Sequence, residues 1–213
     1  MFVEAAIDAA ADAERALLEG AGRLEVCNAL DAGGLTPSRA LLEGCLEFGA
    51  TCMAMARPRA GGHVYGAADF VRLEADVDAL VARGVDGIVF GVLTADGRVD
   101  AVQVRAIVER CAGLETVFHR AFDETQNAAE ALDTLIEWGV TRVLTSGGAP
   151  TAIEGAGTIA MLVTRARGRI QVLPGGGVRA ANVADLATAT GVKQVHARAS
   201  EPGVIAGIRA ALG

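Results

Sequence analysis

The sequence has almost no lysine, few aromatic residues and no long apolar run. Lys193 is the single lysine among 19 basic residues, the arginines form no cluster, and the formal net charge is −7. Nucleic acids and anionic membranes both attract clustered cationic side chains, so we expect neither as a partner. No run approaches the roughly 18 apolar residues of a membrane-spanning helix, so no span is expected.

Paired cysteines are also lacking. Cys27, Cys45, Cys52 and Cys111 are far apart and form no Cys-x-x-Cys motif, which argues against a zinc ribbon or a thioredoxin-like site. The start, Met1–Glu4, has neither the basic residues nor the apolar run of a signal peptide. We therefore expect a cytoplasmic protein without disulfides.

What the sequence does contain is a weak repeat in which a glycine precedes a short β-rich run, as expected where a helix ends and a strand follows. The copies are Gly22–Cys27, Gly49–Met55, Gly84–Phe90, Gly139–Thr145 and Gly191–His196. Strands are predicted near 2–7, 23–27, 51–56, 86–90, 115–119, 141–145, 169–173 and 193–197. Helices are predicted near 10–20, 38–48, 68–83, 100–112, 127–138, 151–167, 179–189 and 202–211.

This alternation predicts an α/β protein with a parallel sheet. Eight units in 213 residues predict a (β/α)₈ TIM barrel that forms one compact domain over residues 1–213. The alternative is an open doubly wound sheet with fewer strands. Helix starts are predicted by Asp100 and Asn127 as N-caps, by Pro37 and Pro202 as first helical residues, and by a capping box over residues 151–154.

The candidate site residues follow from the alternation of side chains along barrel strands. One set faces the lumen, and a charge that faced the helices would be buried without a partner. The charged strand residues Glu4, Glu25, Arg57, His119 and His196 should therefore converge at the C-terminal ends of the strands, where barrel active sites lie. An acid beside a histidine suits proton transfer, so Glu4, Glu25, His119 and His196 are catalytic candidates. The alternative is a set of paired charges that only stabilises the barrel.

The stretch from Glu115 to Asp123 ends a strand in His119, with Arg120 beside it and a carboxylate just beyond. Arg120 has the opposite parity to His119 along the strand. It could hold an anionic ligand together with Arg57, or it could brace the loop through Asp123.

Two glycine-rich loops follow the sixth and seventh predicted strands. Their candidate ligand-binding residues are Ser146, Gly147, Gly175, Gly176 and Gly177. Glycine lets backbone N–H groups approach an anion, and barrels often bind phosphate at such loops. They indicate a small anionic ligand, unless the turns simply need glycine.

A group of soft sulfur atoms, in Cys27, Cys52, Met53 and Met55, is of the type that selects Cu(I), although buried cysteine and methionine are also ordinary core residues. The long loop over residues 57–67 is a candidate lid, and its histidine, His63, is expected to be a solvated loop residue.

Several motifs in order resemble the CutC family, which is named for copper homeostasis. They are Arg23-Leu-Glu-Val-Cys27, Gly33-Gly-Leu-Thr-Pro-Ser38, Met55-Ala-Arg-Pro-Arg59, Asp86-Gly-Ile-Val-Phe-Gly91, Leu93-Thr94, Val117-Phe-His-Arg-Ala-Phe-Asp123, Arg142-Val-Leu-Thr-Ser-Gly147 and Leu173-Pro-Gly-Gly-Gly-Val178. The resemblance implies a (β/α)₈ barrel, a homo-oligomer such as a dimer or tetramer, and a link to Cu(I).

This chain departs from the family pattern at two places. Ala6 stands where the family usually has a cysteine, and that cysteine and the one matching Cys27 are the thiols usually proposed as copper ligands. A dithiolate Cu(I) site therefore cannot form here. In the lid, the usual Arg-Pro-Arg-Gly-Gly-Asp-Phe becomes Arg57-Pro-Arg-Ala-Gly-Gly-His63, which removes a carboxylate.

Three hypotheses follow. The first is a cytoplasmic copper-homeostasis protein that binds Cu(I) through Cys27 with Met55 or Met53. The second is a lyase, isomerase or hydrolase type of enzyme acting on a small phosphorylated or carboxylate metabolite, with Glu25 and His119 exchanging protons. The third is an oligomeric scaffold with a vestigial site. No organic cofactor is indicated.

Overall fold

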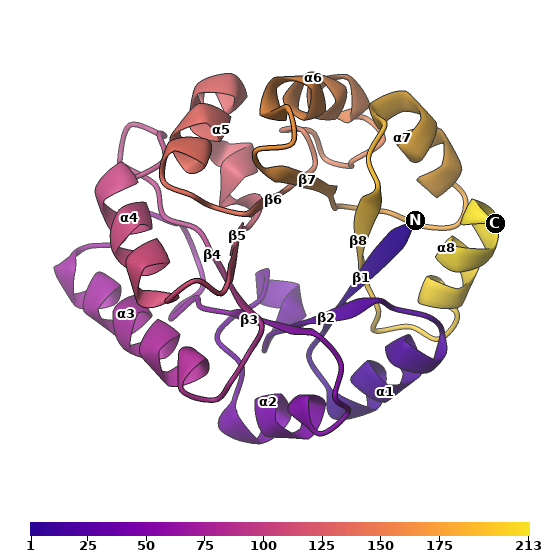
Figure 1. The fold of residues 1–213 in the computed structure, drawn as a ribbon, viewed down its shortest axis with the longest axis horizontal. Helices are drawn as coiled ribbons and strands as arrows, with labels where there is room; N and C mark the ends of the chain where they lie inside the picture. The colour runs from indigo at the N-terminus through magenta and orange to yellow at the C-terminus, as the bar shows by residue number, and fades with distance from the viewer.

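The structure, a computed structural model, describes residues 1–213 and shows eight strands inside a ring of helices (Figure 1). The strands are β1 (Phe2–Ile7), β2 (Arg23–Val26), β3 (Cys52–Met55), β4 (Gly87–Phe90), β5 (Glu115–Phe118), β6 (Arg142–Thr145), β7 (Gln171–Pro174) and β8 (Gln194–Arg198). The helices are α1 (Ala10–Leu18), α2 (Arg39–Leu46), α3 (Ala67–Val81), α4 (Ala101–Arg110), α5 (Ala128–Glu137), α6 (Ala156–Ala166), α7 (Val183–Thr190) and α8 (Val204–Leu212), with 3₁₀ turns η1 (Leu30–Ala32) and η2 (Arg120–Glu124).

The strands form one parallel sheet in the order β7-β6-β5-β4-β3-β2-β1-β8, so the first strand lies between the second and the last. This order confirms the predicted (β/α)₈ barrel and is not that of a doubly wound sheet. No backbone ladder joins β7 to β8. At this seam Gln194 Nε2 donates a hydrogen bond of 2.8 Å to Gln171 Oε1, so side chains join the two strands.

Side chains alternate between the lumen and the helix layer, as barrel geometry requires. On β2, Leu24 and Val26 belong to the large core that packs against the helices. The lumen has its own smaller apolar cluster, formed by Cys27, Met53, Met55, Val89, Val117, Leu144 and Leu173. The charged side chains described below share the lumen with this cluster, and strand register places Glu25 opposite Met53.

Two of the predicted helix starts are confirmed. The Asp100 carboxylate caps α4 by accepting a hydrogen bond of 3.0 Å from the Gln103 amide, and Asn127 caps α5 by accepting from the amides of Ala129 and Glu130. In both cases a side-chain oxygen satisfies N–H groups that the first turn leaves free.

Three predicted starts are wrong in position. Pro37 precedes the N-cap Ser38 of α2 and is not its first helical residue, and Pro202 likewise precedes the N-cap Gly203 of α8. The reciprocal bonds predicted over residues 151–154 do form, at 3.1 and 3.4 Å, but on a turn before α6 begins. A local capping pattern can therefore form a turn without deciding at which residue the helix begins.

No helix is both long and apolar enough to cross a membrane.

The N-cap of α5 can be tested by substitution. We expect Asn127→Ala to destabilise the fold by about 1 kcal/mol, because two amides lose their acceptor. Asn127→Asp keeps an acceptor and should cost less. Urea denaturation of the three proteins measures both differences, and equal stability of wild type and Asn127→Ala would contradict the role of the cap.

Candidate functional site

A cavity of about 700 Å³ opens at the C-terminal ends of the strands. Four of the five predicted lumen residues, Glu25, Arg57, His119 and His196, line it together. The fifth, Glu4, lies directly beneath, in contact with His196. The structure therefore brings together residues that are separated by up to 192 positions in the sequence.

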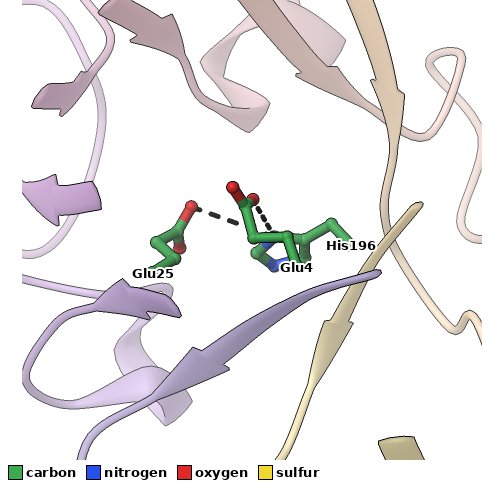
Figure 2. A group of neighbouring side chains, drawn as sticks. All are labelled: Glu4, Glu25 and His196. Carbon is green, nitrogen blue, oxygen red and sulfur yellow. Dashed lines mark hydrogen bonds and ion pairs between the residues drawn. The ribbon is translucent and has the colours of Figure 1, made fainter. Parts of the chain in front are cut away.

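Glu4 is the fully paired acid of this group. Strand register places it opposite both Arg23 on β2 and His196 on β8, and its carboxylate contacts both side chains. His196 Nδ1 lies 2.8 Å from Glu4 Oε1 (Figure 2). Burial alone would raise the pKa of Glu4, but the hydrogen bond and charge of His196 and the charge of Arg23 outweigh it and hold the pKa at about 2.

Glu25 is the unpaired acid. It is buried, its Oε2 accepts no hydrogen bond, and the nearest cationic atom is His196 Nδ1 at 3.9 Å (Figure 2). Burial, reinforced by the negative charge of Glu4 and opposed by His196, raises the pKa of Glu25 to about 7. The pKa of His196 is lowered by burial, but Glu25 and Glu4 together raise it above its ordinary value. A carboxyl group with a raised pKa beside an imidazole can exchange protons with a ligand.

The same three side chains are the group best placed to hold a metal ion. The ligand atoms of Glu4, Glu25 and His196 all lie within 4.8 Å of one another. Carboxylate and imidazole donors suit divalent ions such as Zn²⁺ or Cu²⁺ and not Cu(I). Glu4 and His196 already satisfy each other, which leaves Glu25 Oε2 as the free donor.

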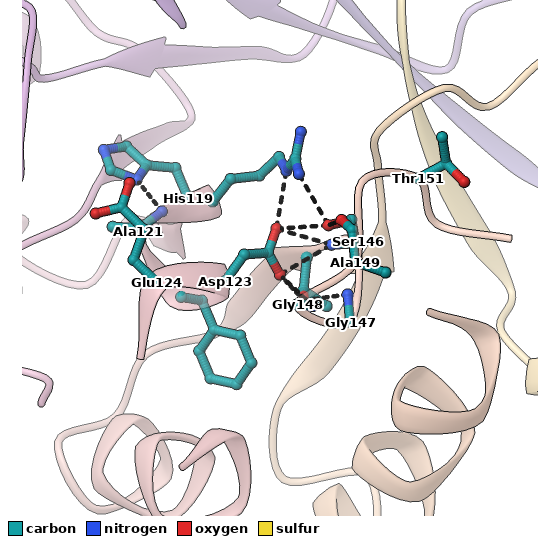
Figure 3. A network of polar contacts seen from close by, with 12 residues as sticks. His119, Ala121, Asp123, Glu124, Ser146, Gly147, Gly148, Ala149 and Thr151 are labelled. Carbon is teal, nitrogen blue, oxygen red and sulfur yellow. Dashed lines mark hydrogen bonds and ion pairs between the residues drawn. The ribbon is translucent and has the colours of Figure 1, made fainter. Parts of the chain in front are cut away.

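His119 presents a single N–H to the cavity. Its Nδ1 accepts a hydrogen bond of 3.1 Å from the Ala121 amide (Figure 3), which places the proton of the neutral ring on Nε2. Nε2 is buried and has no partner. Burial, then the charges of His63 and Arg57, lower the pKa of His119 well below its ordinary value. The ring is therefore a neutral hydrogen-bond donor at physiological pH.

His63 corrects an expectation. It was expected to be solvated, but only 9% of its surface is exposed and its ring lies edge-on to His119, with centroids 4.8 Å apart. A Glu124 carboxylate oxygen lies 3.1 Å from its Nδ1. The available signal was the family pattern, in which an aromatic phenylalanine stands at this position of the lid.

Arg57 fastens two loops in addition to lining the cavity. Its Nη1 donates to the carbonyl oxygens of Ala32 and Gly34, at 2.8 and 3.0 Å, and its Nη2 donates to that of Gly61 at 2.8 Å. No carboxylate pairs with it, and its Nε is buried without a partner. Three of its five N–H groups are thus used within the protein, which leaves Nε–H and one Nη2–H, with an uncompensated charge, for the predicted anion.

The loop after β6 is already filled by the protein itself. Asp123 accepts hydrogen bonds from the Ser146 and Gly148 amides, each at 3.1 Å to Oδ1, and from Thr145 Oγ1 at 2.5 Å (Figure 3). Gly147 donates its amide to Thr145 Oγ1. Asp123 thus occupies the Ser146 amide and Thr145 Oγ1 occupies the Gly147 amide, so neither amide is free for the predicted ligand.

Arg120 takes the second of its two predicted roles. Its Nε donates to Asp123 Oδ2 at 2.8 Å and its Nη2 donates to Ser146 Oγ at 2.8 Å, so it braces the loop. Its Nη1 makes no hydrogen bond within the protein, and the side chain lines the cavity. One N–H pair of this guanidinium is still available to a ligand.

The loop after β7 differs from the loop after β6. The amide of Gly175 donates to Thr145 O at 3.0 Å, so Gly175 is not a ligand-binding donor. The amides of Gly176 and Gly177 donate to no protein group, and both residues line the cavity with φ of +106° and +71°. Among the predicted ligand-binding glycines, Gly176 and Gly177 therefore keep free amides, whereas Gly147 and Gly175 do not.

Known proteins resemble this chain along most of its length. The CutC family model matches residues 1–201. This chain belongs to the CutC family. A CutC family protein of Treponema denticola is 44% identical over 186 residues, covering 87% of this chain and 76% of the relative, and one of Sinorhizobium medicae is 40% identical over 200 residues, covering 94% and 82%.

Solved structures agree with this assignment. The crystal structure of a protein described as the putative copper homeostasis protein CutC, from Streptococcus agalactiae, superposes with a TM-score of 0.87 at 31% identity, covering 92% of this chain and 97% of that one. A thiamine phosphate pyrophosphorylase from Pyrococcus furiosus has a TM-score of 0.68 at 15% identity, covering 99% of this chain and 95% of that one, which shows a shared fold alone.

The side chains of Cys27 and Met55 in this CutC-family chain are adjacent but deeply placed. Cys27 is completely buried, with its Sγ 3.6 Å from Ile7 O. A methyl group on Gly34 would lie 3.4 Å from Cys27 Sγ and 3.1 Å from Met55 Cε, so both side chains meet beneath that glycine. Met55 lines the cavity and Cys27 does not. Burial, then nearby carboxylates, raise the pKa of the Cys27 thiol.

The unpaired state of Glu25 predicts a pH dependence of stability. Its pKa is about 7 in the folded protein and near 4.5 when unfolded, so its contribution is fully present below pH 4.5 and is lost as the pH rises through 7. Between pH 5 and 8 the free energy of unfolding should fall by about 2 to 3 kcal/mol more in the wild type than in Glu25→Gln. Denaturation at both pH values measures this, and parallel losses in the two proteins would contradict the assignment.

The role of Asp123 predicts a large loss of stability. Asp123→Ala leaves the Ser146 and Gly148 amides and Thr145 Oγ1 without their acceptor, which should cost about 3 kcal/mol. Asp133→Ala removes an exposed partner of Arg165 and should cost less than about 1 kcal/mol. Thermal unfolding of both variants tests the contrast, and equal effects would show that the loop does not depend on Asp123.

Proposed function

We propose that this CutC-family protein serves copper homeostasis in the cytoplasm and binds Cu(I) through Cys27 and Met55. The observation that carries the proposal is that the side chains of Cys27 and Met55 meet beneath Gly34, with Met55 lining the cavity. Thiolate and thioether are the ligands that Cu(I) prefers. The likeness to the Streptococcus agalactiae protein, which is itself named for copper homeostasis, supports this role.

The chain sets a limit on such a site. Ala6 on β1 contributes no sulfur, so the site has one thiol and the thioethers of Met55 and Met53, which share the lumen cluster with Cys27. Because the thiol is buried and its pKa is raised, Cu(I) has to displace its proton on binding. We expect weaker binding than a pair of thiolates would give.

Titration with Cu(I) against a competing chelator tests this site. Cys27→Ser should weaken binding by at least about tenfold, corresponding to about 1.4 kcal/mol, and Met55→Leu should also weaken it. Cys111→Ser is the matched control, since Cys111 is also a free, buried thiol but packs in the large core and not with Cys27, Met53 and Met55. Unchanged affinity in Cys27→Ser would contradict the proposal.

A second candidate function is an acid–base enzyme of the lyase, isomerase or hydrolase type, acting on a small anionic metabolite. It is favoured by the position of Glu25, which lines the cavity and has a buried, unpartnered carboxylate oxygen beside His196. Such a pair could remove and return a proton on a bound compound.

Incubation in D₂O with a pool of phosphorylated and carboxylate metabolites tests the second candidate. Mass spectrometry should find deuterium in one compound with the wild type and none with Glu25→Gln. Equal incorporation in the two proteins, or none in either, would contradict this function.

Two further expectations are part of the proposal. The cytoplasmic location is supported by four buried cysteines that are all free thiols, as suits a reducing compartment. The homo-oligomer, a dimer or tetramer, stays a prediction that light scattering can measure.

A further inference from the structure

We infer that the loop Gly176–Val178, together with Arg120, binds the phosphate group of a small phosphate ester, and that His119 Nε2–H donates to another oxygen of the same ligand. This inference rests on the second candidate function, because it names the class of compound that would occupy the cavity. It is independent of copper binding at Cys27 and Met55.

The loop presents three successive amides without partners. The N–H groups of Gly176, Gly177 and Val178 donate to no group of the protein, and all three residues line the cavity. The peptide planes of the Gly177 and Val178 amides are nevertheless fixed, because Gly176 O accepts from the Ala152 amide at 2.9 Å and Gly177 O accepts from Asn182 Nδ2 at 2.8 Å. Consecutive free amides of this kind form a concave nest for an anion.

Positive charge lies beside the nest. A methyl group on Gly176 would lie 3.4 Å from Arg120 Nη1, which is the terminal nitrogen of Arg120 that neither Asp123 nor Ser146 uses. Arg179 and Arg198 also line the cavity. A guanidinium next to backbone N–H groups suits a phosphate oxygen better than a neutral group, since both kinds of donor strengthen with the charge of the acceptor.

A separate observation points to a ligand in the same cavity. His119 Nε2 is a hydrogen-bond donor on a side chain that is 5% exposed, and nothing in the protein accepts its proton. Arg57 Nε is a second buried donor without a partner. Buried polar atoms are nearly always hydrogen-bonded in native proteins, so two unmatched donors on residues that line one cavity indicate an acceptor supplied by a ligand.

The neutral state of His119 decides what it can offer. Because Ala121 donates to Nδ1, the ring can give a proton to a hydrogen bond at Nε2 without carrying a charge. A hydroxyl or carbonyl oxygen of the ester is a suitable acceptor. The cavity volume of about 700 Å³ falls within the range of small-molecule sites.

Binding of defined probes to the full chain tests the inference. Glycerol 3-phosphate and inorganic phosphate should shift the amide NMR resonances of Gly176, Gly177 and Val178, whereas glycerol should not. Arg120→Gln should weaken the binding of both phosphate probes by at least about tenfold, and Arg120→Lys should weaken it less. Arg39→Gln, an exposed arginine of α2 paired with Glu43, is the matched control and should bind as the wild type does.

Two substitutions separate the roles of the His119 ring. His119→Asn keeps an acceptor for the Ala121 amide but lacks the N–H at the Nε2 position. It should therefore weaken the binding of glycerol 3-phosphate and leave the binding of inorganic phosphate unchanged. Gln reaches the Nε2 position with its amide, so His119→Gln should retain more affinity for the ester.

Phosphate probes that leave the three amide resonances unmoved, or that bind Arg120→Gln as tightly as the wild type, would overturn the inference. The wild-type spectra decide the question even if a variant fails to fold. Phosphate binding at this loop without solvent deuterium exchange would support the inference and contradict the acid–base function, so the two can fail separately.

Discussion

The ion pair of Glu4 with Arg23, extended to His196, is the interaction on which the rest of the structure depends. It joins β1 to both neighbouring strands at the point where the chain's first and last strands meet. A buried carboxylate is tolerated only when it is well paired, and here two cationic partners satisfy it. Because His196 is committed to Glu4, Glu25 is left without a partner at the floor of the cavity.

The mouth of the barrel therefore has a satisfied part and an unsatisfied part. In the satisfied part, Asp123 fills the loop after β6 and Arg57 ties neighbouring loops to each other. The unsatisfied part consists of groups without partners on residues that line the same cavity: Glu25 Oε2, His119 Nε2 and the amides after β7. The first part makes the site rigid, and the second defines what a ligand must supply: several acceptors and one donor or proton.

Much of the site could be predicted because side chains alternate between the two faces of a strand. A buried charge has to lie on the face where it can be paired. This alternation predicted that Glu4, Glu25 and His196 lie in the lumen. It applies equally to Arg23 and Arg142, but these two were not named as lumen residues from the sequence. Arg142 is 1% exposed and bonds to Glu115 and Gln171 at the opposite end of the barrel.

Other features could not be predicted from local sequence because they depend on contacts between distant segments. A Ser-Gly-Gly loop looks the same whether a ligand or the protein's own carboxylate occupies it, and only the approach of Asp123 decides between the two. The burial of His63 likewise depends on a loop folding over His119. The set of copper ligands that the family resemblance implies is incomplete in this chain, since Ala6 supplies no thiol.

The central claim is that one lumen carboxylate is fully paired and its neighbour is open to the cavity. Carbon-13 NMR titration of the glutamate side-chain carboxyls measures this most directly. We predict that Glu4 titrates with a pKa of about 2 and Glu25 with a pKa of about 7. Two ordinary titrations near pH 4.5, or the reverse assignment, would contradict it.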